Sequence, residues 1–169
     1  MPKIIRDSAI VEDQAFFLSD ENAATLPNAS PLVISLKTWQ ARRDELLAWG
    51  GQLGLLLQTT DEPETFAADV PVFALIAIQF DKFTDGRGYS LGRLLRERYS
   101  FRGELRAVGD VLQDQLFYLK RSGFNAFAIR ADKSIDVALK SLKDFSETYQ
   151  GAWDQPLPLF KRRQTSSVA

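Results

Sequence analysis

A chain of 169 residues, of which 45% are hydrophobic and 25% charged, is typical of one soluble globular domain. Its formal net charge of -1 disfavours general binding to nucleic acid or to anionic membranes. The chain contains neither cysteine nor histidine, which excludes disulfides, thiolate nucleophiles, Fe–S ligation and histidine-based metal or catalytic sites.

We expect a cytoplasmic protein without a membrane-spanning segment. The N-terminal sequence "MPKIIRDSAIVEDQ" carries early charges and lacks the long apolar run of a signal peptide. No stretch reaches the roughly 20 apolar residues that a transmembrane helix needs. No GxGxxG motif follows a predicted strand and no P-loop is present, so the cofactor is left unknown.

Residues 1–31 are expected to form an N-terminal extension that is irregular or built from short β pieces. The segments "KIIRDSAIV" and "AFFLS" have the composition of such pieces, placed around an "RDS" turn. The polar, turn-rich segment "SDENAATLPNASP" then connects them to the rest of the chain.

Five strands and five helical segments alternate in residues 32–151, which we expect to be an α/β domain. The predicted strands are 32–36, 53–58, 72–80, 104–108 and 126–130. The predicted helices are 39–49, a short one near Pro63, 90–99, one from Asp110 to Gly123, and one from Asp132 or Ser134 to Gly151. Residues 152–169 are expected to be a partly disordered tail. At most Leu157 to Phe160 would pack against the domain.

This alternation predicts a parallel sheet with right-handed crossovers. The near-continuous apolar run "VFALIAIQF" suits a central strand that is covered on both faces. We therefore favour a single-domain α/β fold, an open and mostly parallel five-stranded sheet with helices on both faces. A half-barrel-like βα array is the alternative.

The stretch "FTDGRGYSLGRLLRERYSFRGELRAVGD", Phe83 to Asp110, gathers six arginines and five glycines in a chain that is otherwise not basic. Its first part, "DGRGYS", follows the longest predicted strand and precedes a helix that begins near Ser90. Glycines 86 and 88 would permit positive φ and a close backbone approach. The helix start favours an anion, to which Arg87 would add a bidentate fork.

Loops that follow parallel strands meet at one edge of a sheet, where ligands bind. The sequence therefore predicts an anion-binding or partner-binding site there, formed by Asp85, Gly86, Arg87, Gly88, Ser90, Arg106 and Asp110. No metal site is expected.

Simpler interpretations accompany each of these residues. Arg87 would pair with Asp85 or Asp110, and Asp110 would be the N-cap of the following helix. Arg106 lies within a strand and needs an acidic partner, for which Glu104 is on the same strand face. The remaining arginines are expected on a solvated helix face or at the helix end: Arg93, Arg96, Arg98 and Arg102.

The block "FTDGRGYS…LLRERY…GELRAVGDVLQDQLFYL", extended by "SGFNAF", resembles an uncharacterised bacterial family whose members are described as oxidoreductases of sulfite reduction. The similarity spans most of the chain and is strongest over residues 72–130. The family pattern often has proline at the place of Asp81 and cysteine at the place of Ser122. Because serine replaces that cysteine here, the resemblance implies no redox thiol at this position.

Three functions follow as expectations. The first is an accessory protein of assimilatory sulfite reduction that binds a small oxyanion, a redox partner protein of that pathway, or both, with the other arginines forming a partner surface. The second is an oxidoreductase that uses the same site with a bound cofactor, since side chains without thiols do not supply redox chemistry. The third is a structural module in which the arginines and acids form only internal ion pairs. Self-association into a homo-oligomer is left open.

Overall fold

Eight strands form one sheet in the computed structural model of the chain, which describes residues 2–22, 26–143 and 147–166. The order across the sheet is β2-β1-β8-β7-β6-β5-β4-β3. Strands β3 to β8 run parallel, and β1 is antiparallel to both of its neighbours. The bounds are β1 Lys3–Arg6, β2 Ala9–Glu12, β3 Phe16–Phe17, β4 Leu32–Ser35, β5 Leu53–Gln58, β6 Phe73–Phe80, β7 Glu104–Gly109 and β8 Ala126–Phe127.

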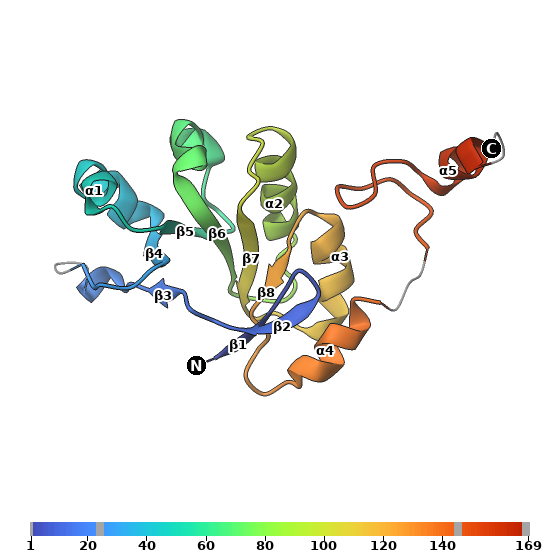
Figure 1. The fold of residues 1–169 in the computed structure, drawn as a ribbon, viewed down its shortest axis with the longest axis horizontal. Helices are drawn as coiled ribbons and strands as arrows, with labels where there is room; N and C mark the ends of the chain where they lie inside the picture. Colours follow the sequence, from blue (N-terminus) through green and yellow to red (C-terminus); the bar gives the residue numbers. More distant parts are fainter. Residues whose placement is uncertain (1, 23–25, 144–146, 167–169) are drawn as a thin grey trace.

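The helices follow the strands in the expected alternation (Figure 1). The α-helices are α1 Leu36–Trp49, α2 Arg87–Glu97, α3 Leu116–Arg121, α4 Ile135–Ser141 and α5 Leu159–Ser166, and the short 3₁₀ helices are η1 Asp20–Asn22, η2 Pro63–Thr65, η3 Ala67–Val72 and η4 Gln113–Gln115. Helix α4 ends well before Gly151, and residues 144–146 of the predicted last helix lie outside the described residues. Helix α5 forms where a tail was expected, and residues 167–169 of that tail are also not described.

The five strands predicted from the sequence are all present, joined by three short strands from the N-terminal extension. Strand β8 is shorter than predicted, with two residues instead of five. The turn at Asp7 and Ser8 between β1 and β2 uses two positive-φ residues, with φ of 49° and 64°. The extension is thus part of the sheet.

The sheet is strongly curled, because three residues connect its two edge strands. Strand β2 lies at one edge and β3 at the other, yet only residues 13–15 separate them in the chain. The step from Glu12 to Phe16 spans at most about 14 Å, whereas a flat eight-stranded sheet would be about 34 Å wide. Figure 1 shows this N-terminal segment crossing the open side of the curl. The half-barrel alternative is therefore confirmed.

The two faces of the sheet have different coverings. The convex face carries the main core, in which Trp39 and Leu46 of α1, Leu91 and Leu95 of α2, and residues of η3, α3 and α4 pack on the strands. The concave face has a second, smaller cluster, Val33, Leu75, Ala77 and Val108, packed by Ala15, Leu56 and Ala128. Among the described residues, none that lies in a helix belongs to this second cluster. The prediction of helices on both faces is corrected, because the crossing segment 13–17 covers the inner face instead.

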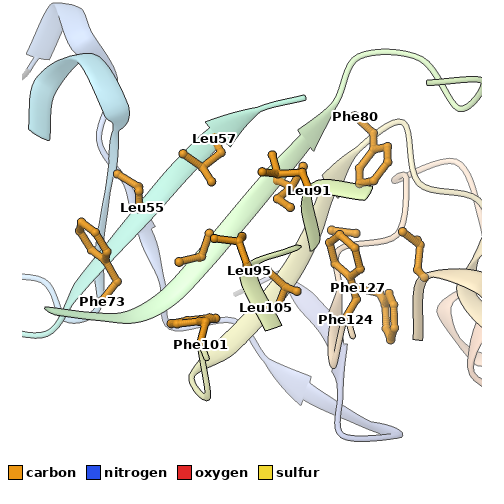
Figure 2. Close-up of a cluster of buried hydrophobic side chains, with 14 of the residues drawn as sticks. Leu55, Leu57, Phe73, Phe80, Leu91, Leu95, Phe101, Leu105, Phe124 and Phe127 are labelled. Atoms are coloured by element: carbon orange, nitrogen blue, oxygen red, sulfur yellow. The ribbon is translucent and has the colours of Figure 1, made fainter. Parts of the chain in front are cut away.

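Helix α2 lies close to the sheet because two of its residues that face core phenylalanine rings are glycines. A Cβ at Gly88 would come within 2.4 Å of the Phe80 ring, and one at Gly92 would come equally close to Phe124. Figure 2 shows Phe80 and Phe124 beside Leu91 and Leu95 in this core. The function of Gly88 is thus close packing.

Replacing Gly88 with alanine should lower the free energy of unfolding by about 1–3 kcal/mol, since a buried ring would have to move. Gly86→Ala is the matched control. No atom lies within 4 Å of a Cβ built at Gly86, so this variant should stay within about 0.5 kcal/mol of the parent. Urea unfolding followed by circular dichroism measures both. Equal stability of the two variants would contradict the packing argument.

Candidate functional site at the strand ends

Loops that follow four parallel strands meet at one edge of the sheet. We call this edge the strand-end rim and define it by Thr59, residues 81–87, Asp110 and Arg130. The Thr59 hydroxyl after β5 donates to Asp85 at 2.6 Å, the Phe83 amide after β6 donates to Asp110 at 3.1 Å, and Arg130 after β8 donates to Asp110 at 2.7 Å. The structure therefore brings these segments together through direct hydrogen bonds.

Asp85 organises the start of helix α2. Its carboxylate accepts from the Arg87 backbone amide at 3.1 Å and from the Arg87 guanidinium at 2.9 and 2.7 Å. The Arg87 side chain, followed by the Thr59 hydroxyl, lowers the pKa of Asp85 far below its usual range. The protein's own Asp85 carboxylate thus lies at the start of α2, where the sequence predicted the anion of a ligand.

The glycines of "DGRGYS" contribute differently from the prediction. Gly86 has φ of -71° and ψ of -14°, an ordinary right-handed conformation. Gly88 is buried beneath Phe80 and Thr59 within α2. Neither glycine uses positive φ, so the positive φ expected at these two positions is wrong. Ser90 is an exposed residue of α2.

Asp110 is not the N-cap that its position suggested. Strand β7 ends at Gly109 with φ of 92°, where a Cβ would lie 2.4 Å from the Phe80 carbonyl oxygen, and the next helical turn starts only at Gln113. The side chain that closes this turn is Gln115, which accepts from the Leu112 amide at 2.9 Å. The Asp110 carboxylate is therefore free to tie the rim loop to Arg130.

A cavity of about 340 Å³ opens at the rim, lined by Asp81, Lys82, Thr84, Asp85 and Arg87. The Arg87 side chain remains 62% exposed although it forms an ion pair with Asp85. The Lys82 ammonium has no ion pair within the described ranges. Two cationic and two anionic side chains thus surround the cavity, and both cations are accessible to a binding partner.

Phe83 is an exposed aromatic residue on an anchored loop, a feature that the sequence reasoning missed. The residue is 51% exposed. Its backbone is held on both sides, since the amide donates to Asp110 at 3.1 Å and the carbonyl accepts from Gln115 at 2.9 Å. The sequence signal was a phenylalanine between Lys82 and Thr84, in the loop that follows the longest predicted strand.

Arg106 lies far from the rim, although the sequence included it in the anion site. It points from β7 into the concave face, with 2% of its side chain exposed, and donates to both carboxylate oxygens of Asp13 at 2.9 Å. It also donates to Glu104 at 2.6 Å, which confirms the acidic partner predicted on its own strand. Phe17 completes the enclosure, with its ring centre 5.9 Å from the guanidinium carbon. Arg106 thus fastens the crossing segment to the sheet.

Arg96 is also placed differently from the prediction of a solvated helix face. It is 5% exposed and donates to the carbonyl oxygens of Gly123, Phe101 and Gly103 and to the Asn125 side chain, at 2.8 to 3.1 Å. Arg93 and Arg98 agree with the prediction, since their exposed side chains pair with Glu97 and Glu64.

The described residues, 2–22, 26–143 and 147–166, contain neither a cluster of metal ligands nor a membrane-spanning helix. No group of three or more carboxylates there is placed to hold a metal ion. None of the helices found in those residues combines the length and the apolar character needed to cross a lipid bilayer.

The fold and the rim define a single-domain α/β protein with a curled, mostly parallel sheet and a polar site at its strand ends. The chain belongs to a family of bacterial proteins of unknown function, DUF934, whose model matches residues 54–160, more than half of the chain. No curated protein matches it. The match covers α2 and the whole rim, so the arginine-rich stretch lies within the family's own region.

Proposed function

We propose that this protein is a cytoplasmic accessory protein of assimilatory sulfite reduction, which binds a partner protein of that pathway through the strand-end rim. The pathway is inferred from the resemblance of the block around "FTDGRGYS" to proteins described in sulfite reduction. The mode of action is inferred from the rim.

The observation that carries the binding mode is the exposed ring of Phe83 on a backbone held by Asp110 and Gln115. Exposed aromatic side chains that are rigidly presented are frequent anchors of protein interfaces. Lys82 and Arg87 of the same loop line the rim cavity and supply accessible positive charge. Such charges steer association with an acidic surface.

A small oxyanion is the second candidate ligand, favoured by the cavity beside Lys82 and Arg87. Asp85 and Asp81 oppose it, because an anion in this cavity would meet two carboxylates. Calorimetric titration with sulfite tests this candidate, and saturable heat that is lost in Arg87→Met would support it. An oxidoreductase with a bound flavin is separated from both by the visible absorbance of the purified protein.

The partner proposal predicts a growth phenotype. A bacterium that lacks the gene should grow on cysteine but poorly on sulfate or sulfite as sole sulfur source, and the parent gene should restore growth. The triple variant Lys82→Glu, Phe83→Ser, Arg87→Glu should fail to restore it, since both the anchor and the charges are lost. Growth rates on the sulfur sources are the measurement.

The matched control is Tyr118→Ser, which removes another exposed aromatic residue, on α3. This variant should restore growth fully. Circular dichroism of both purified variants checks that they fold. Normal growth of the deletion strain on sulfite would overturn the pathway assignment, and full restoration by the triple variant would overturn the rim as the binding surface.

A further inference from the structure

Arg96 in the C-terminal half of α2 is a buried cation whose guanidinium has no direct carboxylate partner, although Asp7 lies close enough to favour its charged form. All four hydrogen-bond partners of the buried Arg96 guanidinium are neutral, three carbonyls and one amide. Its burial, followed by repulsion from Arg102, lowers the pKa of Arg96 to about 10, so the group is charged at neutral pH. A buried cation without a carboxylate partner leaves a positive potential at the nearby surface.

Arg102 adds a second cation beside it. The Arg102 side chain stacks over Trp153, with 4.9 Å between the guanidinium carbon and the ring centre, and it has no carboxylate partner in the described part of the chain. Arg96 approaches the same ring at 6.0 Å. Two guanidinium groups thus share one indole.

A hollow of about 460 Å³ opens beside this stack, lined by Arg93, Glu97, Gly151, Ala152, Trp153 and Pro156. We call it the Trp153 hollow. Its volume lies within the roughly 300–1,000 Å³ range of small-molecule sites. The segment that forms one wall is held in place, since the Trp153 amide donates to the Arg121 carbonyl at 3.1 Å and Arg121 pairs with Asp154. Arg93 and Glu97 line the hollow and pair with each other at 2.9 Å, while Arg102 and Arg96 adjoin it through their contacts with the Trp153 ring.

We propose that the Trp153 hollow binds a small organic anion, with its apolar body against the indole and its negative group near Arg102 and Arg93. Aromatic and aliphatic wall atoms favour an apolar body, and guanidinium groups favour a carboxylate, sulfonate or phosphate. This site is separate from the rim residues and uses none of them. A negative result for ligand binding at the Trp153 hollow would leave the proposed partner binding at the rim intact. A negative result at the rim would likewise leave the proposal for the hollow intact.

The experiment uses the full chain labelled with ¹⁵N and phenyl phosphate as the probe. The chain has three tryptophans, so three indole N–H signals report three places at once. Trp153→Phe identifies the signal of the hollow. We expect this signal to shift saturably with phenyl phosphate, while the signal of Trp39, buried and bonded to Asp69 at 3.0 Å, stays in place.

Two comparison ligands separate charge from apolar contact. Phenol keeps the ring without the charge, and inorganic phosphate keeps the charge without the ring. Both should bind at least about tenfold more weakly than phenyl phosphate, because each loses one of the two contributions.

Arg102→Met should weaken phenyl phosphate binding about tenfold. Arg43→Met is the matched control, since Arg43 also stacks on a tryptophan, 5.8 Å from the Trp39 ring centre, but is neutralised by Asp69. This control should bind as the parent does. An unshifted Trp153 signal, equal binding of phenol, or unchanged affinity in Arg102→Met would each overturn the proposal.

Discussion

Arg106→Met should lower the free energy of unfolding by about 3–5 kcal/mol, a decrease of about 6–20 °C in Tm for a chain of this size. The variant leaves the Asp13 and Glu104 carboxylates facing each other, 9% and 13% exposed, without the cation between them. Uncompensated buried charge is one of the costliest consequences of a single substitution. Urea unfolding monitored by circular dichroism gives the value.

Arg6→Met is the matched control for this cluster. Arg6 also pairs with Glu104, but at 3.4 Å and with 46% of its side chain exposed. Its loss should therefore cost at most about 1 kcal/mol. A similar decrease in the free energy of unfolding for Arg6→Met and Arg106→Met would contradict the importance assigned to the burial of Arg106.

A double variant tests whether Arg106 acts through the crossing segment. Asp13→Asn removes the charge on that segment, and its cost should not add to the cost of Arg106→Met. We expect a coupling energy of at least about 1 kcal/mol between the two sites. Additive losses would show that Arg106 stabilises the sheet without fastening the segment.

Arg96→Lys should also lower the free energy of unfolding by at least about 3 kcal/mol, although it keeps the charge. The guanidinium fork reaches four acceptors from three parts of the chain, Phe101 to Gly103, Gly123 and Asn125. A lysine ammonium is a compact group with three donors and leaves buried carbonyls without partners. The same unfolding experiment measures the effect.

Arg93→Lys on the same helix is the control for Arg96. Arg93 is exposed and pairs with Glu97 one turn later, an interaction that lysine also makes, so its stability should change by less than about 0.5 kcal/mol. If Arg96→Lys proved as stable as Arg93→Lys, the buried hydrogen-bond network would not be the stabilising element.

These expectations also bear on the two proposed binding surfaces. Arg96 and Arg106 are buried and stabilise the fold, whereas Arg87 and Arg102 are exposed and accessible to a ligand or partner. The six arginines between Phe83 and Asp110 therefore serve different purposes. The third expectation from the sequence, an internal ion-pair network, describes Arg106 well and Arg87 in part, since Arg87 pairs with Asp85 and still exposes most of its side chain.

Much of the site geometry followed from local patterns. The alternation of apolar runs with helical segments predicted the parallel strands, and the strand-end rule predicted that the loop around Asp85 and the residue Asp110 would lie at the same edge of the sheet. The need of a strand arginine for an acid predicted the bond between Arg106 and Glu104. Each of these depends on neighbours in the sequence or on the direction of parallel strands.

The sequence alone determined the class of the fold, because periodicity decides which segments become helices and which become strands. The tertiary structure decided the curl, the burial of Arg96 and the partner of Arg106, since Asp13 lies 93 residues away from it in the chain. Such contacts depend on which distant segments meet once the sheet bends, and no local spacing encodes that meeting. For this reason Arg106 holds the crossing segment to the sheet, whereas Arg87, a residue of the same type, is an accessible cation.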